Sequence, residues 1–210
     1  MTTWPNLLSS GGLVLWLILA VSAVAIVVFI ERFLHYHRAQ INSIEFLNGV
    51  RNVLRRDNIV EAISICDATP GPVARLVKTA ILNRDQGRER ISEALEETGL
   101  AEVPRLEEKL NLLATIAQIS PLLGLLGTVI GLMQTFHDIG HAGLMANVDL
   151  VSGGVWKALI CAGAGLAVAI PVQAGYNYLV NRVNSIVLDM ERAATEIAHI
   201  VTEATTVKPA

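Results

Sequence analysis

Three long runs without a charged residue constrain this sequence more than any other feature. They cover Leu13–Ile30, Leu110–Phe136 and Ala158–Val180, whereas Glu31–Lys109 holds most of the charge. The first run has about 18 residues, near the minimum for a helix that crosses a hydrocarbon core about 30 Å thick. The second, at about 27 residues, can cross with tilt or overhang. A soluble domain would spread its apolar residues with helical or strand periodicity. We therefore predict an all-α integral membrane protein with three transmembrane helices.

Composition argues against several classes of function. The chain is 52% hydrophobic and 17% charged, and its net charge of -3 comes without a cluster of basic residues, which argues against a nucleic-acid partner. Cys66 and Cys161 lie in regions of different character, so no disulfide is expected. The sequence contains no phosphate-binding glycine loop and no nucleophile elbow. We expect neither an enzyme nor a bound cofactor.

The first run is a membrane anchor rather than a signal peptide. Ala23-Val24-Ala25 could mimic a cleavage site, but residues 1–12 contain no Lys or Arg, so the basic n-region of a signal peptide is missing. Basic residues instead follow the run, at Arg32 and Arg38.

Charge asymmetry sets the expected orientation. The predicted loop at 137–154 contains Asp138 and Asp149 but no Lys or Arg. The opposite ends of the runs are flanked by Arg32, Arg38, Lys109, Arg182 and Arg192. By the positive-inside rule, the N-terminus and this loop face outward, and the charged segment and the C-terminal tail are cytoplasmic. The predicted segments are a periplasmic N-terminus at 1–12, transmembrane helices at 13–30, 110–136 and 155–180, a cytoplasmic helical domain at 31–109, a periplasmic loop at 137–154, and a cytoplasmic C-terminal helix and tail at 181–210.

The cytoplasmic segments show helical patterns and no strand alternation. We expect helices in 43–57, 73–83 and 88–100, with a turn at 69–72 and Gly99 as a stop for the third helix. Pro104 is expected near the start of a long helix that leads into the second span. Apolar residues of 181–203 share one face of a helix. The apolar faces of these cytoplasmic helices either pack on one another as a helical bundle or, alternatively, dock a separate partner.

The second and third spans carry strips of small residues. In the second span these are Gly124, Gly127 and Gly131, a small-xxx-small pattern that lets another helix approach closely. The third span has a matching strip of Ala158, Cys161, Ala162, Gly165 and Ala169. Thr128 lies beside the glycines, and Pro121 and Thr135 are seven residues away on roughly the same side. The glycines are explained by helix packing alone. Thr128 either faces a pore or bonds its hydroxyl to its own backbone.

Two further absences matter. His137 and His141 are four residues apart with Asp138 beside them, but Gly140 and the loop position argue against a rigid metal site, so no metal is expected. The spans contain no Asp, Glu or His at mid-membrane depth, where a proton relay needs a titratable group. If protons cross here, another polypeptide must supply the carboxylate.

Ala117–Phe136 and Ala158–Tyr178 carry a family resemblance. Their sequences are AQISPLLGLLGTVIGLMQTF and ALICAGAGLAVAIPVQAGYNY, and they resemble the MotA/TolQ/ExbB proton channel family, most closely its ExbB/TolQ branch. The resemblance implies a homopentamer in the bacterial inner membrane, with a central pore that holds the single transmembrane helix of an ExbD- or TolR-like partner bearing the titrating Asp. It implies proton-driven work passed across the periplasm by a TonB- or TolA-like protein, and a pore-facing role for Thr128.

Two positions depart from the family pattern. Lys157 stands where relatives tend to have Glu, and Ala162, next to Cys161, stands where they usually have a pore-lining Thr. Lys157 either places a positive charge at the outer mouth of the pore or snorkels to the interface. The proton-path candidates are thus Thr128, Pro121, Thr135, Ala162 and Cys161. The alternative function is a non-conducting pentameric scaffold for a partner protein.

Overall fold

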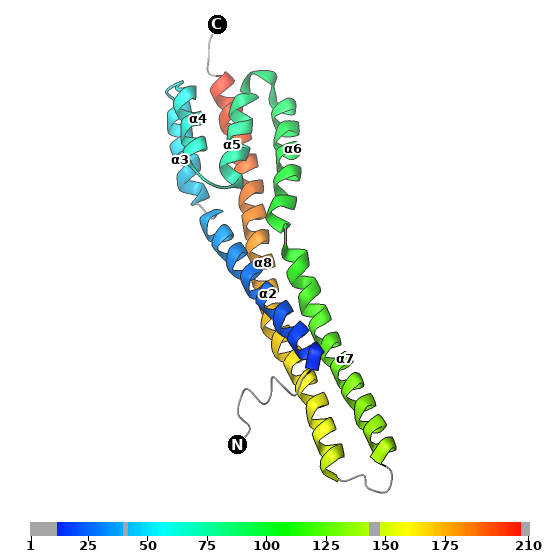
Figure 1. Cartoon of the computed structure of the whole chain (residues 1–210). Coiled ribbons are helices and arrows are strands. Elements are labelled where there is room, and N and C mark those ends of the chain that lie inside the picture. The colour runs from blue at the N-terminus through cyan, green and yellow to red at the C-terminus, as the bar shows by residue number, and fades with distance from the viewer. Residues whose placement is uncertain (1–11, 40–41, 143–147, 207–210) are drawn as a thin grey trace. The chain divides into compact units, whose positions relative to one another are not determined.

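The computed structural model describes residues 12–39, 42–142 and 148–206, and side chains within 12–39, 42–141 and 151–202. Every regular element among these residues is helical (Figure 1). In chain order they are α2 (Gly12–Ala39), α3 (Ser43–Leu54), α4 (Ile59–Ala68), α5 (Pro72–Leu82), the short 3-10 helix η1 (Arg84–Gln86), α6 (Arg88–Glu107), α7 (Leu110–Ala142) and α8 (Val148–Thr206). The predicted all-helical class is confirmed.

The chain divides into two compact units, each described here by itself. The membrane unit comprises residues 12–31 and 109–178, and the extramembrane unit comprises residues 32–108 and 179–206. Three helical stretches, within Gly12–Leu54, Arg88–His141 and Val151–Thr202, are long and apolar enough to cross a membrane. They contain the three predicted runs, so the described residues include three candidate transmembrane helices, as predicted.

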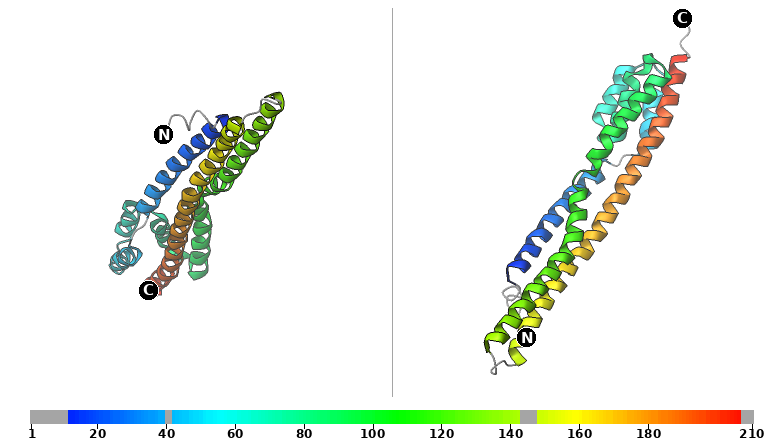
Figure 2. Two further views of the ribbon diagram at one scale, coloured as in Figure 1. Left: turned by 90° about the horizontal axis from the view of Figure 1, so that it is seen from below. Right: turned by 90° about the vertical axis from the view of Figure 1, so that its right-hand side faces the viewer.

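In the membrane unit, α7 and the first half of α8 run side by side, as both views of Figure 2 show. Much of their outward surface is apolar: Leu125, Met133 and Phe136 of α7 are exposed, and so is Ile170 of α8. A soluble protein would not leave so continuous an apolar surface open to water. It suits helices whose outer faces contact lipid or other transmembrane helices.

In the extramembrane unit, α5 and α8 supply much of the core. Val73, Val77 and Ile81 of α5 are buried along one face, at the spacing of an amphipathic helix. The described part of α8 beyond residue 179 buries a stripe that includes Val183, Ile186, Met190, Ala193 and Ile197. The apolar stripe predicted in the tail therefore packs inside this unit, as the helical-bundle interpretation expected.

Local sequence explains how the short helices begin. Asn42 and Asn58 cap α3 and α4, where each side chain accepts a hydrogen bond from the backbone N–H three residues on, at 3.4 and 3.3 Å. The predicted turn at 69–72 ends with Gly71 at φ 123° and Pro72 as the first residue of α5. A Cβ on Gly71 would lie 2.9 Å from the carbonyl oxygen of Ala39, so both the conformation and the space require glycine.

Two predicted boundaries are wrong. Gly99 does not end a helix, because α6 continues to Glu107 with Pro104 inside it. The chain breaks instead at Glu108 and Lys109, where Lys109 adopts φ 65° and α7 begins anew at Leu110. One helix therefore does not lead from Pro104 into the second span. Glycine costs a helix only about 1 kcal/mol, which tertiary packing can offset.

The end of α6 is bound to the continuation of α2. The buried hydroxyl of Tyr36 donates a hydrogen bond to the carbonyl of Leu106 at 2.5 Å. Arg32, also buried, pairs with Glu108 at 3.2 Å. Since the last carbonyls of a helix have no partner within the helix, Tyr36 satisfies one of them where α6 stops.

Candidate functional site

The small residues of α7 and α8 form one continuous contact in the membrane unit. A Cβ placed on Gly124 would lie 2.9 Å from the carbonyl oxygen of Cys161 and 3.2 Å from Cα of Gly165. One placed on Gly165 would lie 2.6 Å from the carbonyl oxygen of Ser120. One on Gly131 would lie 3.2 Å from Cβ of Ala158. The helices thus approach backbone to backbone, as the two strips of small residues predicted. We call this contact the α7–α8 seam.

The seam has a regular antiparallel register. Going along α7 from Gly124 through Gly127 and Gly131, the facing residues on α8 go backward from Gly165 through Cys161 to Ala158. Each step is three or four residues on both helices, which is the spacing of residues on one helix face. The spacing of the glycines therefore determines which face of α7 packs on α8.

Three of the proton-path candidates contact this seam: Ala162 approaches Gly124 through its Cα, and Cys161 and Thr135 have buried side chains there. Cys161 is buried, and its Sγ would be 3.0 Å from a Cβ on Gly127. Thr135 is also buried; it donates a hydrogen bond to the carbonyl of Gly131 at 2.8 Å and fills the space beside Gly154. Within one chain, both side chains are therefore covered by the partner helix of the seam.

The side chains of the other candidates, Ala162 included, are more open. Thr128 is half-buried, and its hydroxyl donates a hydrogen bond to the carbonyl of Leu125 at 2.5 Å. A bond to its own helix backbone was one of the two interpretations of this residue. Pro121 and Ala162 are also half-buried, and α7 is a single helix through Pro121. Lys157 is exposed near the start of the apolar part of α8. The structure thus separates Thr128, Pro121 and Ala162, which keep accessible surface, from Thr135 and Cys161.

Sequence reasoning missed Ser120 as a member of the seam. Its side chain is almost fully buried and donates to the carbonyl of Ile116 at 2.7 Å, while its own carbonyl faces Gly165. The signal was present, because Ser120 precedes Gly124 by four residues and so extends the strip of small residues by one turn. The bonded hydroxyl lets a polar side chain sit at a dry helix contact.

α2 packs against the seam with larger side chains. Val14 approaches Gly127, and the ring of Phe29 would lie 2.9 Å from a Cβ on Gly175. An apolar cleft of about 310 Å³ lies among Ser22, Phe29, Leu113, Pro171 and their neighbours. α2 therefore covers part of the α7–α8 pair and leaves an apolar hollow beside α8.

Charged groups of the membrane unit lie outside the apolar runs. Glu31 of α2 pairs with Lys109 where α7 begins, and His137 and Asp138 lie towards the other end of α7. Among the residues that the structure describes, no three His, Cys, Asp or Glu side chains group as metal ligands do. The seam is therefore lined by small, uncharged side chains and offers no titratable carboxylate of its own.

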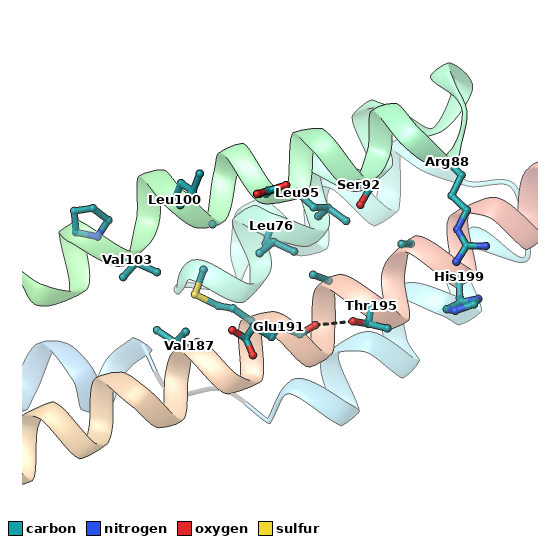
Figure 3. A pocket seen from close by; sticks show the side chains of 16 residues that line it. Leu76, Arg88, Ser92, Leu95, Leu100, Val103, Val187, Glu191, Thr195 and His199 are labelled. Atoms are coloured by element: carbon teal, nitrogen blue, oxygen red, sulfur yellow. Dashed lines mark hydrogen bonds between the residues drawn. The ribbon is translucent and has the colours of Figure 1, made fainter.

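The extramembrane unit has a groove of about 670 Å³ between α6 and α8 (Figure 3). Apolar side chains that include Leu76, Val103 and Val187 line the groove, and Arg88 and His199 lie at one end of it. None of the residues that carry the membrane motifs lies in it.

Two sets of ion pairs hold helices of this unit together. The buried carboxylate of Glu102 accepts from Arg75 at 2.8 Å and from Arg105 at 3.0 Å. Arg51 of α3 pairs with Glu196 of α8 at 2.5 Å.

Cys66 is buried, and desolvation by burial, with a smaller contribution from Asp67, raises the pKa of its thiol to about 11. At neutral pH this cysteine is thus an unreactive packing residue.

The fold and the α7–α8 seam together define a helical membrane protein with several spans, in which the second and third spans pack against each other through glycine residues. The model of the MotA/TolQ/ExbB proton channel family matches residues 68–192, more than half of the chain. The chain belongs to this family, and its relatives place it in the ExbB/TolQ branch.

Three relatives illustrate the match. A putative biopolymer transport protein ExbB homolog of Methanothermobacter thermautotrophicus is 28% identical over 177 residues, which are 83% of this chain and 62% of that protein. The putative biopolymer transport protein ExbB-like 1 of Synechocystis is 33% identical over 176 residues, 81% of this chain and 69% of the relative. The Tol-Pal system protein TolQ of Haemophilus influenzae is 42% identical over 88 residues, 42% of this chain and 38% of the relative. The chain thus spans less than two thirds of the length of the first of these proteins.

Proposed function

We propose that this protein is a proton-channel, stator-like subunit of an energy-transducing complex in the bacterial inner membrane. The observation that carries the proposal is the α7–α8 seam, found in a chain that belongs to a proton channel family. Close backbone approach packs the two helices tightly against each other, so together they can form one wall of a path between helices. The proposed role involves no catalysed reaction and no cofactor.

The titrating group in this proposal belongs to a partner. The three apolar runs contain no acidic residue and no histidine. A membrane proton relay needs such a group, and an intramembrane charge is costly unless protein surrounds it. We therefore infer an ExbD- or TolR-like single-span partner whose transmembrane Asp sits inside a homopentamer of this chain. A TonB- or TolA-like protein would carry the work across the periplasm.

Thr128 is the best candidate for the wall of the proton path. It is half-buried within one chain, whereas Thr135 is covered by α8 at Gly154. Although the Thr128 hydroxyl donates to its own backbone, its oxygen can still accept a hydrogen bond from a protonated carboxyl or a water. Pro121 and Ala162 keep accessible surface too and complete the proposed lining.

The proposed orientation follows the distribution of basic residues. The N-terminus and the segment between α7 and α8 face the periplasm, and the extramembrane unit faces the cytoplasm. Lys157 is exposed near the periplasmic end of α8, where it either snorkels or adds a positive charge to the outer mouth. An exposed side chain with a flexible four-carbon stem favours the snorkelling arrangement.

The test is proton flux into lipid vesicles that contain this protein with its single-span partner. We expect flux that depends on the partner and falls at least several-fold in Thr128→Ala. The matched control is Thr115→Ala, an exposed threonine of the same helix whose hydroxyl also bonds to its own backbone, at 2.7 Å. Partner-dependent flux that is indifferent to Thr128→Ala would contradict the assigned path. Co-purification of the partner without any flux would instead support a non-conducting pentameric scaffold.

A further inference from the structure

Two histidines lie on one face of α7 near its end. Because α7 extends to Ala142, His137 and His141 are not in a loop but on a regular helix, one turn apart. The loop position that argued against a rigid site does not apply. Histidines at i and i+4 on a helix project together, which is how helical zinc sites present two of their ligands.

The ring nitrogens already converge. The two Nε2 atoms are 3.2 Å apart, and the ring centroids are 4.4 Å apart at an interplanar angle of 63°. A Zn–N bond of about 2.0–2.1 Å and a tetrahedral angle place two nitrogen ligands about 3.3–3.4 Å apart. The observed separation of the two Nε2 atoms is therefore close to the separation that one metal ion requires of two imidazole ligands.

Asp138 places a carboxylate near the second nitrogen of one ring. Its Oδ1 is 3.7 Å from Nδ1 of His137, on the far side of the ring from the converging nitrogens. In metal sites, a carboxylate near the second ring nitrogen commonly fixes the tautomer that leaves the other nitrogen free to bind the ion. All three side chains are exposed, so ions in solution can reach them.

We propose that His137 and His141 form a two-histidine site for a divalent transition-metal ion of the zinc and copper class. Imidazole ligands suit these ions, and Cu²⁺ is expected to bind more tightly than Zn²⁺. Among the described residues no third His, Cys, Asp or Glu groups with the pair, so the proposal is limited to these two protein ligands. The inference is independent of the proposed channel function.

The test is Cu²⁺ binding to the full-length protein, purified in detergent without a histidine tag and followed by electron paramagnetic resonance. We expect one equivalent per chain with two nitrogen ligands, and competition by Zn²⁺. His137→Gln and His141→Gln should each weaken binding at least tenfold. The matched control, His199→Gln, removes an exposed histidine of α8 and should leave the affinity unchanged.

A substitution at Gly140 tests whether the helix holds the two histidines in position for the metal ion. It is helical, and a Cβ on it would meet no atom within 4 Å. Gly140→Ala should therefore stiffen this turn of α7 and tighten Cu²⁺ binding several-fold, since alanine holds a helix better than glycine. Equal binding by wild type and both glutamine variants, or a one-nitrogen spectrum, would overturn the site. Unchanged binding in Gly140→Ala would refute the claim that the helix preorganises it.

Discussion

Gly165→Ala is the substitution that most directly probes the α7–α8 seam. The added Cβ would lie 2.6 Å from the carbonyl oxygen of Ser120 and 2.9 Å from Cα of Gly124. Both are backbone atoms, so no rotamer change can relieve the contact. Ordinary contact begins at 3.4 Å, and the helices would have to separate locally by roughly 0.8 Å.

That separation has a calculable cost. Inserting an extra methyl group into a well-packed contact typically costs about 1–3 kcal/mol. For a chain of this length, each kcal/mol corresponds to a shift of roughly 2–4 °C in Tm. We therefore expect Gly165→Ala to lower the apparent Tm by roughly 2–12 °C. The higher helix propensity of alanine would offset up to about 1 kcal/mol of that loss.

The assay is thermal unfolding in detergent, followed by tryptophan fluorescence. Gly163→Ala is the matched control, because it lies two residues away on α8 and its added Cβ would meet no atom within 4 Å. The control should keep or slightly raise the wild-type Tm. If Gly165→Ala unfolds at the wild-type temperature, or if both variants lose the same stability, the seam does not hold α7 and α8 together as described.

Four further outcomes are expected. Because the pKa of Cys66 is raised to about 11 from 9.0, its thiolate fraction at neutral pH, and hence its labelling by iodoacetamide, should be roughly 100-fold below that of an exposed thiol. The stability that this pKa shift contributes is complete below about pH 9 and is lost as pH rises towards 11. The free energy of unfolding of wild type should therefore change with pH between these values more steeply than that of Cys66→Ala. Equal pH dependence of the two unfolding free energies would contradict the raised pKa. Tyr36→Phe leaves the buried carbonyl of Leu106 without its donor and should cost about 1–3 kcal/mol, measured as a lower Tm; no change would mean that water replaces the hydroxyl. If the proposed channel conducts, Zn²⁺ added from the side of His137 should slow proton flux in wild type but not in His137→Gln, and slowing in both would place the inhibitory ion elsewhere.

Length and charge made the membrane spans predictable. A run of about 18 or more uncharged residues has few stable solutions other than a transmembrane helix, because every backbone N–H and C=O must be satisfied inside it. The small-residue strips were equally readable, since side-chain size at Gly124 or Gly165 is a property of the sequence. Their spacing predicted which faces of the second and third spans pack together, and the structure showed which residues lie opposite one another in the seam.

Boundaries that depend on context were not predictable. Gly99 lies within α6, and the break falls at Lys109, a residue with no intrinsic preference for φ 65°. The segment 137–154 has the composition of a loop, yet its described residues, to Ala142 and from Val148, are helical. Propensity is a weak guide at helix ends, where a few contacts decide whether one more turn forms.

The sequence by itself therefore determined the three membrane spans, the family and the faces through which the second and third spans pack. These are set by local quantities: apolar length, charge and side-chain size. Only the tertiary structure decided that Thr135 and Cys161 are covered in the seam while Thr128 keeps accessible surface. It also decided that His137 and His141 share a helix face. Burial depends on which backbone lies opposite, and residue spacing along one helix does not contain that information. The two histidines share a face only because residues 137–142 continue α7, an end point that local propensity predicts weakly.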